Sequence, residues 1–306
     1  MVDPAEECNF KGRTAGPRQT GKVYGKVVKT WFCEELKGQW RQSLPIGPAL
    51  VDQQSDFQHI QVFETDGFGR MLVLDGKVQC TERDEFTYHE MLTHVPMLTH
   101  PNPETVVVVG GGDGGTMREA LRHPSISKGT LVEIDPQVMD VARQWLPTMA
   151  AGLQPGPRLE VVARDAAEVI GSLPPQDVIL VDSSDPEGPS EVLFSGQFFQ
   201  SLKAALKPDG IIALQAGSPF FFGPQIAAAR RELEKVFRFV RPYLVAIPTY
   251  PGGTWCLIAA SDAHDPQALG LEELRSRRQQ RGLELRYYSP EVHLGSMALP
   301  EFVREL

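Results

Sequence analysis

The sequence predicts an α/β protein: a Rossmann-like, doubly wound sheet preceded by a small antiparallel β domain. Alternating apolar and polar residues fill the stretch before residue 84, and a Gly-rich turn follows the first of several buried strands. Runs that are apolar on both faces and alternate with helical segments are typical of a parallel sheet covered by helices on both sides. These runs are TVVVV (105–109), TLVEI (130–134), LEVVA (159–163), DVILV (177–181) and GIIAL (210–214).

The chain before residue 84 divides into two parts. Residues 1–20 are polar and contain Gly and Pro, which predicts a flexible lead-in. Residues 21–83 are predicted to form the N-terminal β domain. Within them HIQVFET (59–65) and RMLVLDG (70–76) alternate in polarity and flank a glycine-containing turn, which is the pattern of a strand, a turn and a strand.

Residues 84–306 are predicted to form the Rossmann-like domain, and the candidate catalytic residues below belong to it. Its first segment, DEFTYHEMLTHVPMLTH (84–100), has apolar residues at helical spacing, and Pro101 and Pro103 follow as stop signals. Between the second and third strands, PQVMDVARQWL (136–146) begins with proline at the first helical position, which predicts another helix. Strand, turn and helix then repeat along the domain.

Composition narrows the function classes. The formal net charge of -9 argues against a nucleic-acid partner. The 4 cysteines are far apart and form no CxxC pair, so neither a zinc cluster nor a disulfide framework is expected, and a reducing cytoplasm fits. No signal-peptide core and no run of about 18 apolar residues occurs. We expect a cytoplasmic protein with no membrane partner.

The Gly-rich turn VVVVGGGDGG (106–115) predicts a nucleotide or nucleoside site. Gly110, Gly112 and Gly115 stand in GxGxxG spacing between a strand and a helical segment, where the backbone approaches a ligand beside a positive helix N-terminus. Glu133 ends the second strand, where a carboxylate accepts hydrogen bonds from ribose hydroxyls. These features fit NAD and a methionine nucleoside equally well.

Asp113, inside the glycine turn, favours one of these two ligands. A carboxylate there repels a pyrophosphate but pairs with an ammonium group, so we expect a cationic nucleoside rather than NAD. Asp165, after the third strand, is placed either to reach an adenine amino group or to cap the next helix. Asp165 alone does not decide between these roles.

The stretch VDSSDPEGP (181–189) places two carboxylates at the end of the fourth strand. Asp182 stands at the strand end and Asp185 follows in the loop. Two acids at such a position suit a cationic ligand, and the prolines and glycine after them predict a shaped loop that covers the site.

Two histidines before the first strand of the Rossmann-like domain suggest no metal site, and two tyrosines are candidate site residues. HEMLTH (89–94) has one residue more than the zinc motif HExxH, so His89 and His94 lie roughly 140° apart around a helix. Tyr88 follows a run of acids, and Tyr250 stands in the loop IPTYPGG beside proline and glycines. Composition leaves both tyrosines open between packing and function.

Together these residues resemble the spermidine synthases, the polyamine aminopropyltransferases. The resemblance extends from about Tyr24 to the C-terminus. It implies a Rossmann-like domain similar to that of class I methyltransferases, and a homodimer or homotetramer assembled largely through the N-terminal part. The motifs that carry it are WFCEEL (31–36), LVLDGKVQCTERDEFTYHEML (72–92), GGGDGG (110–115), VEID (132–135), DSSDPEGP (182–189) and IPTYPGG (247–253).

The resemblance implies spermidine biosynthesis: aminopropyl transfer from decarboxylated S-adenosylmethionine to putrescine. The adenosyl compound is a co-substrate, and no cofactor is expected. Asp182 would be the base. The residues implied for donor binding are Gln58, Gln79, Gly110, Gly112, Asp113, Glu133 and Asp165. Those implied for acceptor binding are Tyr88, His89, Asp185, Gln215 and Tyr250.

Two other functions are open at this level. A diamine methyltransferase would bind the unmodified methionine nucleoside, whose carboxylate would meet Asp113 as a like charge, although putrescine N-methyltransferases keep much of this framework. A non-catalytic polyamine-binding homologue would not need base, donor loop and acceptor carboxylates together. ARDAAEV around Asp165 and QAGSPFFFG (215–223) depart from the family pattern, and the second leaves the choice of amine open.

Overall fold

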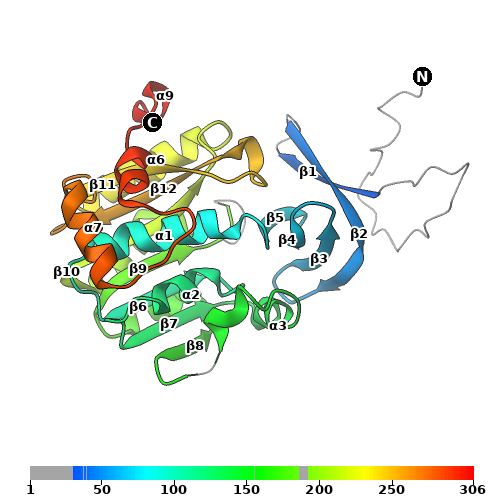
Figure 1. Cartoon of the computed structure of the whole chain (residues 1–306), viewed down its shortest axis with the longest axis horizontal. Helices are drawn as coiled ribbons and strands as arrows, with labels where there is room; N and C mark the ends of the chain where they lie inside the picture. The colour runs from blue at the N-terminus through cyan, green and yellow to red at the C-terminus, as the bar shows by residue number, and fades with distance from the viewer. Residues whose placement is uncertain (1–29, 37, 39, 155, 186–191) are drawn as a thin grey trace, which may run out of the picture.

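The computed structural model describes residues 30–36, 38, 40–154, 156–185 and 192–306. The lead-in predicted for residues 1–20 lies outside them. The described residues form a five-stranded and a seven-stranded sheet that lie next to each other (Figure 1). The predicted fold class, an α/β domain with a small antiparallel β domain before it, is confirmed. No helix in the described part of the chain is long and apolar enough to cross a membrane.

The N-terminal sheet is an antiparallel meander, because each strand pairs with the next along the chain. Asp75 and Gly76 both have positive φ, at 47° and 76°, and join the last two strands in a two-residue turn. Turns with two positive φ angles match the twist of a hairpin and need Gly, Asn or Asp. The strands are β1 (Thr30–Leu36), β2 (Trp40–Gln54), β3 (His59–Thr65), β4 (Gly69–Leu74) and β5 (Lys77–Thr81).

Both faces of the N-terminal sheet bury apolar side chains. Phe63, Met71, Val73 and Val78 form a cluster on one face. On the other face a second cluster combines strand residues with side chains of α3 (Pro136–Trp145) and the turn after it: Ile60, Val62, Leu72, Cys80, Val138, Val141, Leu146 and Met149. The second cluster holds the N-terminal sheet against the large domain, so the two sheets meet along a shared apolar contact.

The large sheet has the order β11-β12-β10-β9-β6-β7-β8, in which β12 alone runs antiparallel to its neighbours. The sequence indicated five of these seven strands. β11 and β12 were not identified; Arg241 and Pro242 interrupt the apolar pattern of β11, whereas β12 was not assigned although its run is apolar. The strands are β6 (Thr105–Gly110), β7 (Lys128–Glu133), β8 (Leu159–Ala163), β9 (Gln176–Asp182), β10 (Leu206–Gly217), β11 (Phe239–Ala246) and β12 (Thr254–Ser261).

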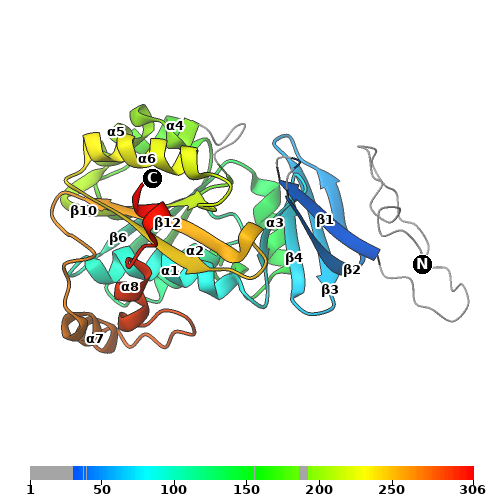
Figure 2. The same ribbon diagram turned by 90° about the horizontal axis from the view of Figure 1, so that it is seen from above.

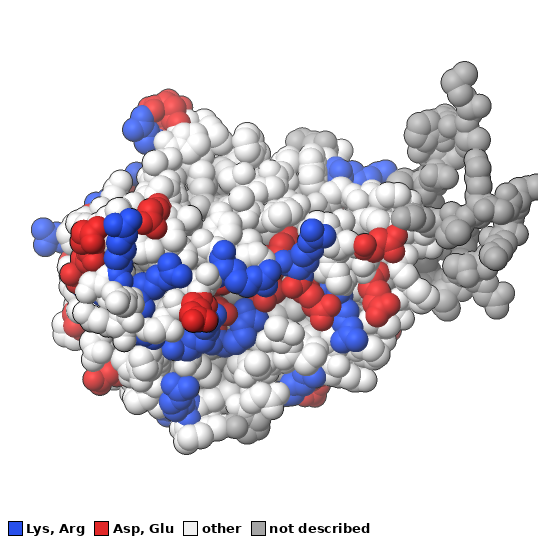
Figure 3. Space-filling view, viewed as in Figure 1, with Lys and Arg blue, Asp and Glu red and all other residues white. Residues whose placement is uncertain are grey.

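Helices cover both faces of the large sheet (Figure 2). One face carries α1 (Glu85–Thr99), α2 (Gly115–Leu121), α7 (Leu271–Gln280) and α8 (Pro290–Ser296). The other carries α4 (Ala166–Val169), α5 (Gly196–Ala204) and α6 (Gly223–Val236), and α9 (Glu301–Arg304) ends the chain. On the surface over α7 and α1, acidic and basic side chains lie side by side (Figure 3). Some of them form ion pairs, such as Arg275 with Glu291 at 2.5 Å.

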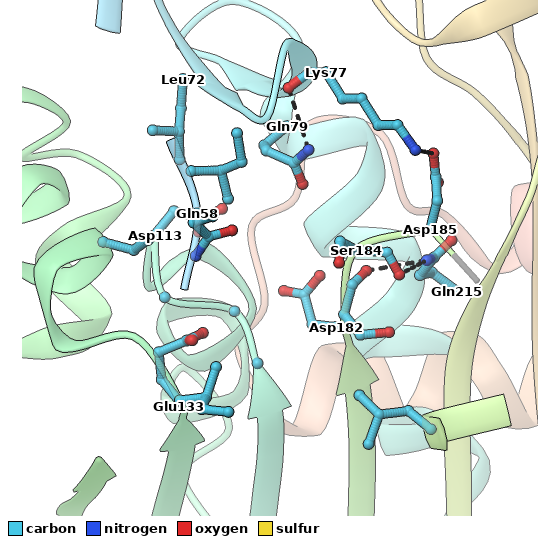
Figure 4. A pocket seen from close by; sticks show the side chains of 18 of the residues that line it. Gln58, Leu72, Lys77, Gln79, Asp113, Glu133, Asp182, Ser184, Asp185 and Gln215 are labelled. Carbon is cyan, nitrogen blue, oxygen red and sulfur yellow. Dashed lines mark hydrogen bonds and ion pairs between the residues drawn. The ribbon is translucent and has the colours of Figure 1, made fainter. Parts of the chain in front are cut away.

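Strand order fixes where a ligand can bind. The order in which the strands follow one another reverses between β6 and β9, which are parallel, hydrogen-bonded neighbours although β7 and β8 lie between them in sequence. A crevice opens outside the carboxyl ends of the strands at such a switch point. In this protein the carboxyl ends of β6, β7 and β9 face the N-terminal sheet, so the crevice becomes a cavity between the two domains (Figure 4).

Candidate active site

A cavity of about 320 Å³ lies between the carboxyl ends of the large sheet and the N-terminal sheet, which contributes residues of β1, β4, β5 and the loop before β3. This is the size of a small-molecule site. Twelve of the thirteen residues named from the sequence line it: Gln58, Gln79, Tyr88, Gly110, Gly112, Asp113, Glu133, Asp165, Asp182, Asp185, Gln215 and Tyr250. Their individual roles stay predictions, but the chain brings them together from both domains (Figure 4).

The glycine turn lies directly against the carboxyl ends of β7 and β9, which carry Glu133 and Asp182. A Cβ added at Gly110, where φ is 77°, would lie 2.2 Å from the backbone oxygen of Asp182. At Gly112 it would lie 3.0 Å from Oε2 of Glu133. The Gly111 N–H donates to the Asp182 carbonyl at 2.8 Å, which ties the turn to the end of β9. Because glycine has no side chain, the turn can lie in direct contact with the two acids at the strand ends.

Asp113 is held by a row of alternating charges. Its Oδ1 accepts a hydrogen bond from the Gly115 N–H at 2.6 Å and lies 3.5 Å from Nε2 of His89. The His89 Nδ1 donates to Glu85 at 2.6 Å, and Arg118 donates to both oxygens of Glu85. Glu85 and His89 come from α1, whereas Arg118 comes from α2, so packing of these helices assembles the row.

His89 therefore lies elsewhere than expected. Its ring is buried behind Asp113 and does not line the cavity. Gly115 leaves room for it, because a Cβ there would lie 2.3 Å from Cε1 of the ring. The third glycine of the GxGxxG pattern thus accommodates a side chain. α1 is buried on nearly all sides, so apolar periodicity did not show which way His89 points.

Opposite charges set the ionisation of this pair. Burial opposes the imidazolium of His89, but the carboxylates of Asp113 and Glu85 outweigh burial and raise the pKa of His89 to about 10. Burial also opposes ionisation of Asp113, yet His89 and the Gly115 N–H outweigh it and hold the pKa of Asp113 below its ordinary value. Asp113 is therefore ionised near neutral pH in the wall of the cavity.

Asp182 has the opposite electrostatic environment. Burial, with the negative charge of Asp113, raises its pKa above the ordinary value. Its partners are neutral: the Tyr88 hydroxyl donates to Oδ1 and the Thr116 hydroxyl to Oδ2, each at 2.6 Å. Burial also raises the pKa of Tyr88 well above its usual range, so the phenol remains a donor. A carboxylate of raised pKa, oriented by two hydroxyls, is suited to accept a proton.

Glu133 and its neighbours form one end of the cavity. Burial raises the pKa of Glu133 to about 7, and its Oε1 accepts from the Asp135 N–H at 2.9 Å. Asp135 caps α3 through the Gln137 N–H and accepts a hydrogen bond from the Gln58 amide at 3.0 Å. Asp165 lines the cavity and also caps α4 through the Ala167 N–H at 2.8 Å. Both roles considered for Asp165 are compatible with this placement.

Gln215 and Tyr250 order the opposite end. The Gln215 amide donates to the carbonyls of Ser183 and Ser184 at 3.0 and 2.8 Å, which fixes the backbone between the two acids of β9 and its loop. The Gln215 side-chain oxygen accepts from the indole of Trp255 at 3.0 Å. Tyr250 donates to the Gln79 carbonyl at 2.5 Å. This end of the cavity is therefore held by contacts between β5, β10 and the loop after β11.

Two residues of this end were not identified from the sequence, Glu34 and Lys77. Glu34 is 3% exposed and accepts from the Gln42 amide at 2.6 Å, and burial raises its pKa to about 7. Lys77 places Nζ 3.5 Å from Asp185. Glu34 and Glu35 stand next to each other in WFCEEL, and strand pairing decides which of them turns inward.

Two groups of histidines lie outside the cavity. His94 contacts His123 at 2.9 Å and Glu119 at 3.0 Å. At the amino ends of the parallel strands, His100, Asp209 and His264 lie close enough to hold a metal ion. However, Nδ1 of His100 accepts from the Asn102 N–H at 3.3 Å, so a neutral ring carries its proton on Nε2. A proton, and not a lone pair, then faces Asp209.

Comparisons with known proteins match both domains. The family model described as a spermine/spermidine synthase domain matches residues 85–268, and a spermidine synthase tetramerisation domain matches residues 30–82. The chain is 40% identical over 280 residues to a polyamine aminopropyltransferase of Shouchella clausii, covering 91% of this chain and 99% of that protein. A polyamine aminopropyltransferase of Bacillus cereus is 42% identical with the same coverage.

Solved structures agree. A spermidine synthase in complex with the transition state analogue AdoDATO superposes with a TM-score of 0.86 at 38% identity, covering 94% of this chain and 97% of that one. The spermidine synthase of Thermotoga maritima gives a TM-score of 0.83 at 37% identity, covering 94% and 96% of the two chains. The likeness therefore extends over both sheets and the cavity between them.

Proposed function

The chain belongs to the spermine and spermidine synthase family and is an aminopropyltransferase, and we propose that it transfers the aminopropyl group of decarboxylated S-adenosylmethionine to putrescine. The products would be spermidine and methylthioadenosine. The observation that carries this proposal is the pair of partly buried carboxylates in one cavity whose surroundings move their pKa values in opposite directions, Asp113 downward and Asp182 upward. Such a split indicates a cation-binding anion beside a base.

The donor is proposed to lie along the carboxyl ends of β6, β7 and β8. Its ammonium would pair with Asp113, whose charge the His89 row maintains. Its ribose hydroxyls would bind Glu133, and its adenine would reach Asp165. A donor that kept its carboxylate would bring a second negative charge to Asp113, and this repulsion favours the decarboxylated form. Gln58, Gln79, Gly110 and Gly112 complete this half of the wall.

The acceptor is proposed to lie between Asp182 and Glu34. Asp182 would take the proton of the attacking amine, and Tyr88 would keep that carboxylate in place. Asp185, Gln215 and Tyr250 line the same end and would position the amine chain. Glu34 would receive the distal ammonium, which would also lower the pKa of this buried acid. For His89 we propose an indirect role, through Asp113.

The chemistry needs a nucleophile and a fixed geometry. A primary amine is protonated near neutral pH, so it must lose a proton before its nitrogen can attack. As the nitrogen–carbon bond forms, the carbon–sulfur bond of the sulfonium breaks and a neutral thioether leaves with the bonding electrons. The proton goes to Asp182. Holding the amine, carbon and sulfur in line supplies much of the remaining acceleration.

We propose that the protein works as a homo-oligomer. The tetramerisation-domain match covers the N-terminal sheet, and β1 forms an edge of that sheet. Trp31, on β1, is 49% exposed, and a large apolar side chain on an edge strand is suited to pack against a second copy of the chain. Sedimentation at several concentrations would measure the assembly. A monomer at every concentration would contradict this part of the proposal.

An amine panel tests the function. Purified protein is given decarboxylated S-adenosylmethionine together with putrescine, cadaverine, agmatine or spermidine, and methylthioadenosine is quantified. We expect methylthioadenosine with putrescine, and none when unmodified S-adenosylmethionine replaces the donor. Absence of methylthioadenosine with every amine would overturn the proposal. Methyl transfer from S-adenosylmethionine would instead identify a diamine methyltransferase.

A further inference from the structure

Lys77 introduces a positive charge into an otherwise acidic cavity. Among the described residues that line the cavity it is the single Lys or Arg, whereas seven are Asp or Glu. Its Nζ lies 3.5 Å from Oδ2 of Asp185, and the two side chains are 28% and 14% exposed (Figure 4). Partial burial on both sides weakens solvent screening of this pair. The lysine therefore changes the charge that an entering cation meets.

The backbone fixes where Lys77 stands. It pairs with Leu74 across the two-residue turn at Asp75 and Gly76, so it is the first residue of β5 after a tight hairpin. The next residue, Val78, donates its N–H toward Glu34 at 3.4 Å, which keeps the start of β5 beside that acid. Lys77 is thus positioned by a turn that allows little variation in register.

Glu34, Lys77 and Asp185 form one electrostatic group, which we call the acceptor-end cluster. The charge of Asp185 raises the pKa of Glu34 and the charge of Lys77 lowers it, so both act on the same carboxyl. Two acids and one lysine leave this end with less negative charge than two acids alone. A cationic group that enters must share Asp185 with Lys77 or displace it.

We propose that Lys77 is a specificity-determining residue that weakens binding of acceptors carrying a second ammonium at the acceptor-end cluster. The inference rests on the proposed function, because it takes the acceptor to be an amine lying between Asp182 and Glu34. A diamine places its distal ammonium beside Lys77, where like charges repel. A monoamine has no charge there and is unaffected. Lys77 thereby sets the preference between monoamine and diamine acceptors.

Three proteins measured side by side test this inference: wild type, Lys77→Met and Lys77→Arg, each saturated with methylthioadenosine. Calorimetry gives the Kd of putrescine, and competition against putrescine gives that of butylamine, which has one amine fewer. We expect Lys77→Met to bind putrescine about fivefold more tightly, the scale of a partly exposed charge pair. Butylamine affinity should change less than twofold, and Lys77→Arg should match wild type for both amines.

Unchanged or weaker putrescine binding by Lys77→Met would overturn the inference. An equal gain for butylamine would do so as well, because it would show a change of pocket shape rather than of charge. Lys77→Gln serves as a second neutral variant if Lys77→Met does not fold. The readout is binding, so it does not depend on turnover. A wild-type protein that makes no methylthioadenosine would refute the proposed function, whereas the measured Kd values would still decide the effect of Lys77.

Discussion

Asp113 and Asp182 are both partly buried and line one cavity, Asp113 in the glycine turn and Asp182 at the end of β9, yet their surroundings differ. Asp113 faces an imidazolium and a backbone N–H, whereas Asp182 faces two neutral hydroxyls. A cation partner holds Asp113 ionised, whereas burial and the nearby negative charge of Asp113 raise the pKa of Asp182 despite its two hydroxyl donors. Residue type and burial therefore do not distinguish the roles of the two acids. The charges of the groups around each carboxylate do.

The largest effect is expected at the base. Asp182→Asn keeps one oxygen to accept from a hydroxyl, while its NH2 can donate to the other hydroxyl, but it cannot take a proton, so kcat should fall about a thousandfold. Donor affinity should change less than about threefold, because the donor contacts are assigned to other residues. Rapid-mix single-turnover assays and calorimetry on the same preparation measure the two quantities. An equal loss of donor affinity would show that Asp182 binds the donor instead.

The second prediction concerns Asp113, the anion proposed to bind the donor ammonium. Asp113→Asn removes the partner of the donor ammonium and leaves the buried His89 charge without this acid, so donor affinity should fall about a hundredfold. Methylthioadenosine has no ammonium and should bind within about threefold of its wild-type affinity. Glu133→Gln is the matched control, because it should weaken both ligands alike. If Asp113→Asn also weakened both alike, the charge pairing would be wrong.

The third prediction separates His89 from a contact residue. His89→Gln retains a hydrogen-bond donor beside Asp113 but removes the positive charge that holds its pKa down. Donor affinity should fall about tenfold near neutral pH. The Asp113 pKa rises when its cation is lost. As the pH is lowered, donor affinity should therefore begin to weaken at a higher pH in the variant than in wild type. A pH-independent loss would indicate packing, whereas an unchanged donor Kd with a raised putrescine KM would indicate acceptor contact.

The smallest effect is expected at the far end of the acceptor. Glu34 has a pKa of about 7, so it is fully ionised only above neutral pH. The KM of putrescine in wild type should therefore fall as pH rises through this value, in addition to any effect of amine ionisation. Glu34→Gln should raise the KM about fivefold at alkaline pH and remove this component. Butylamine, without a distal charge, provides the control and should show no such difference.

Much of the fold was predictable because it depends on local pattern. Apolar runs identified β6 to β10, and the glycine turn after β6 placed the ligand site at the correct edge of the sheet. β11 escaped because Arg241 and Pro242 break its apolar run, and its antiparallel pairing with β12, the next strand along the chain, compensates. Apolar periodicity within β11 does not report the hydrogen bonds and packing that a partner strand supplies.

Most residues that line the cavity could be predicted from the sequence, but the groups that they contact could not. Charged residues at strand ends and in the glycine turn could be named, since parallel strands bring their carboxyl ends together. His89 could not be placed, because every face of its helix is buried or nearly so. Glu34 and Lys77 required the strand register, which decides which side chain faces the cavity.

The split between the two carboxylates can be measured directly. Aspartate labelled with ¹³C at the side-chain carboxyl is titrated by NMR in the free wild-type protein, and the Asp113→Asn and Asp182→Asn spectra assign the two signals. We predict that the signal missing in Asp182→Asn titrates above the ordinary aspartate range, while the one missing in Asp113→Asn remains ionised throughout that interval. Titration in the reverse order, or both signals within the ordinary range, would contradict the account.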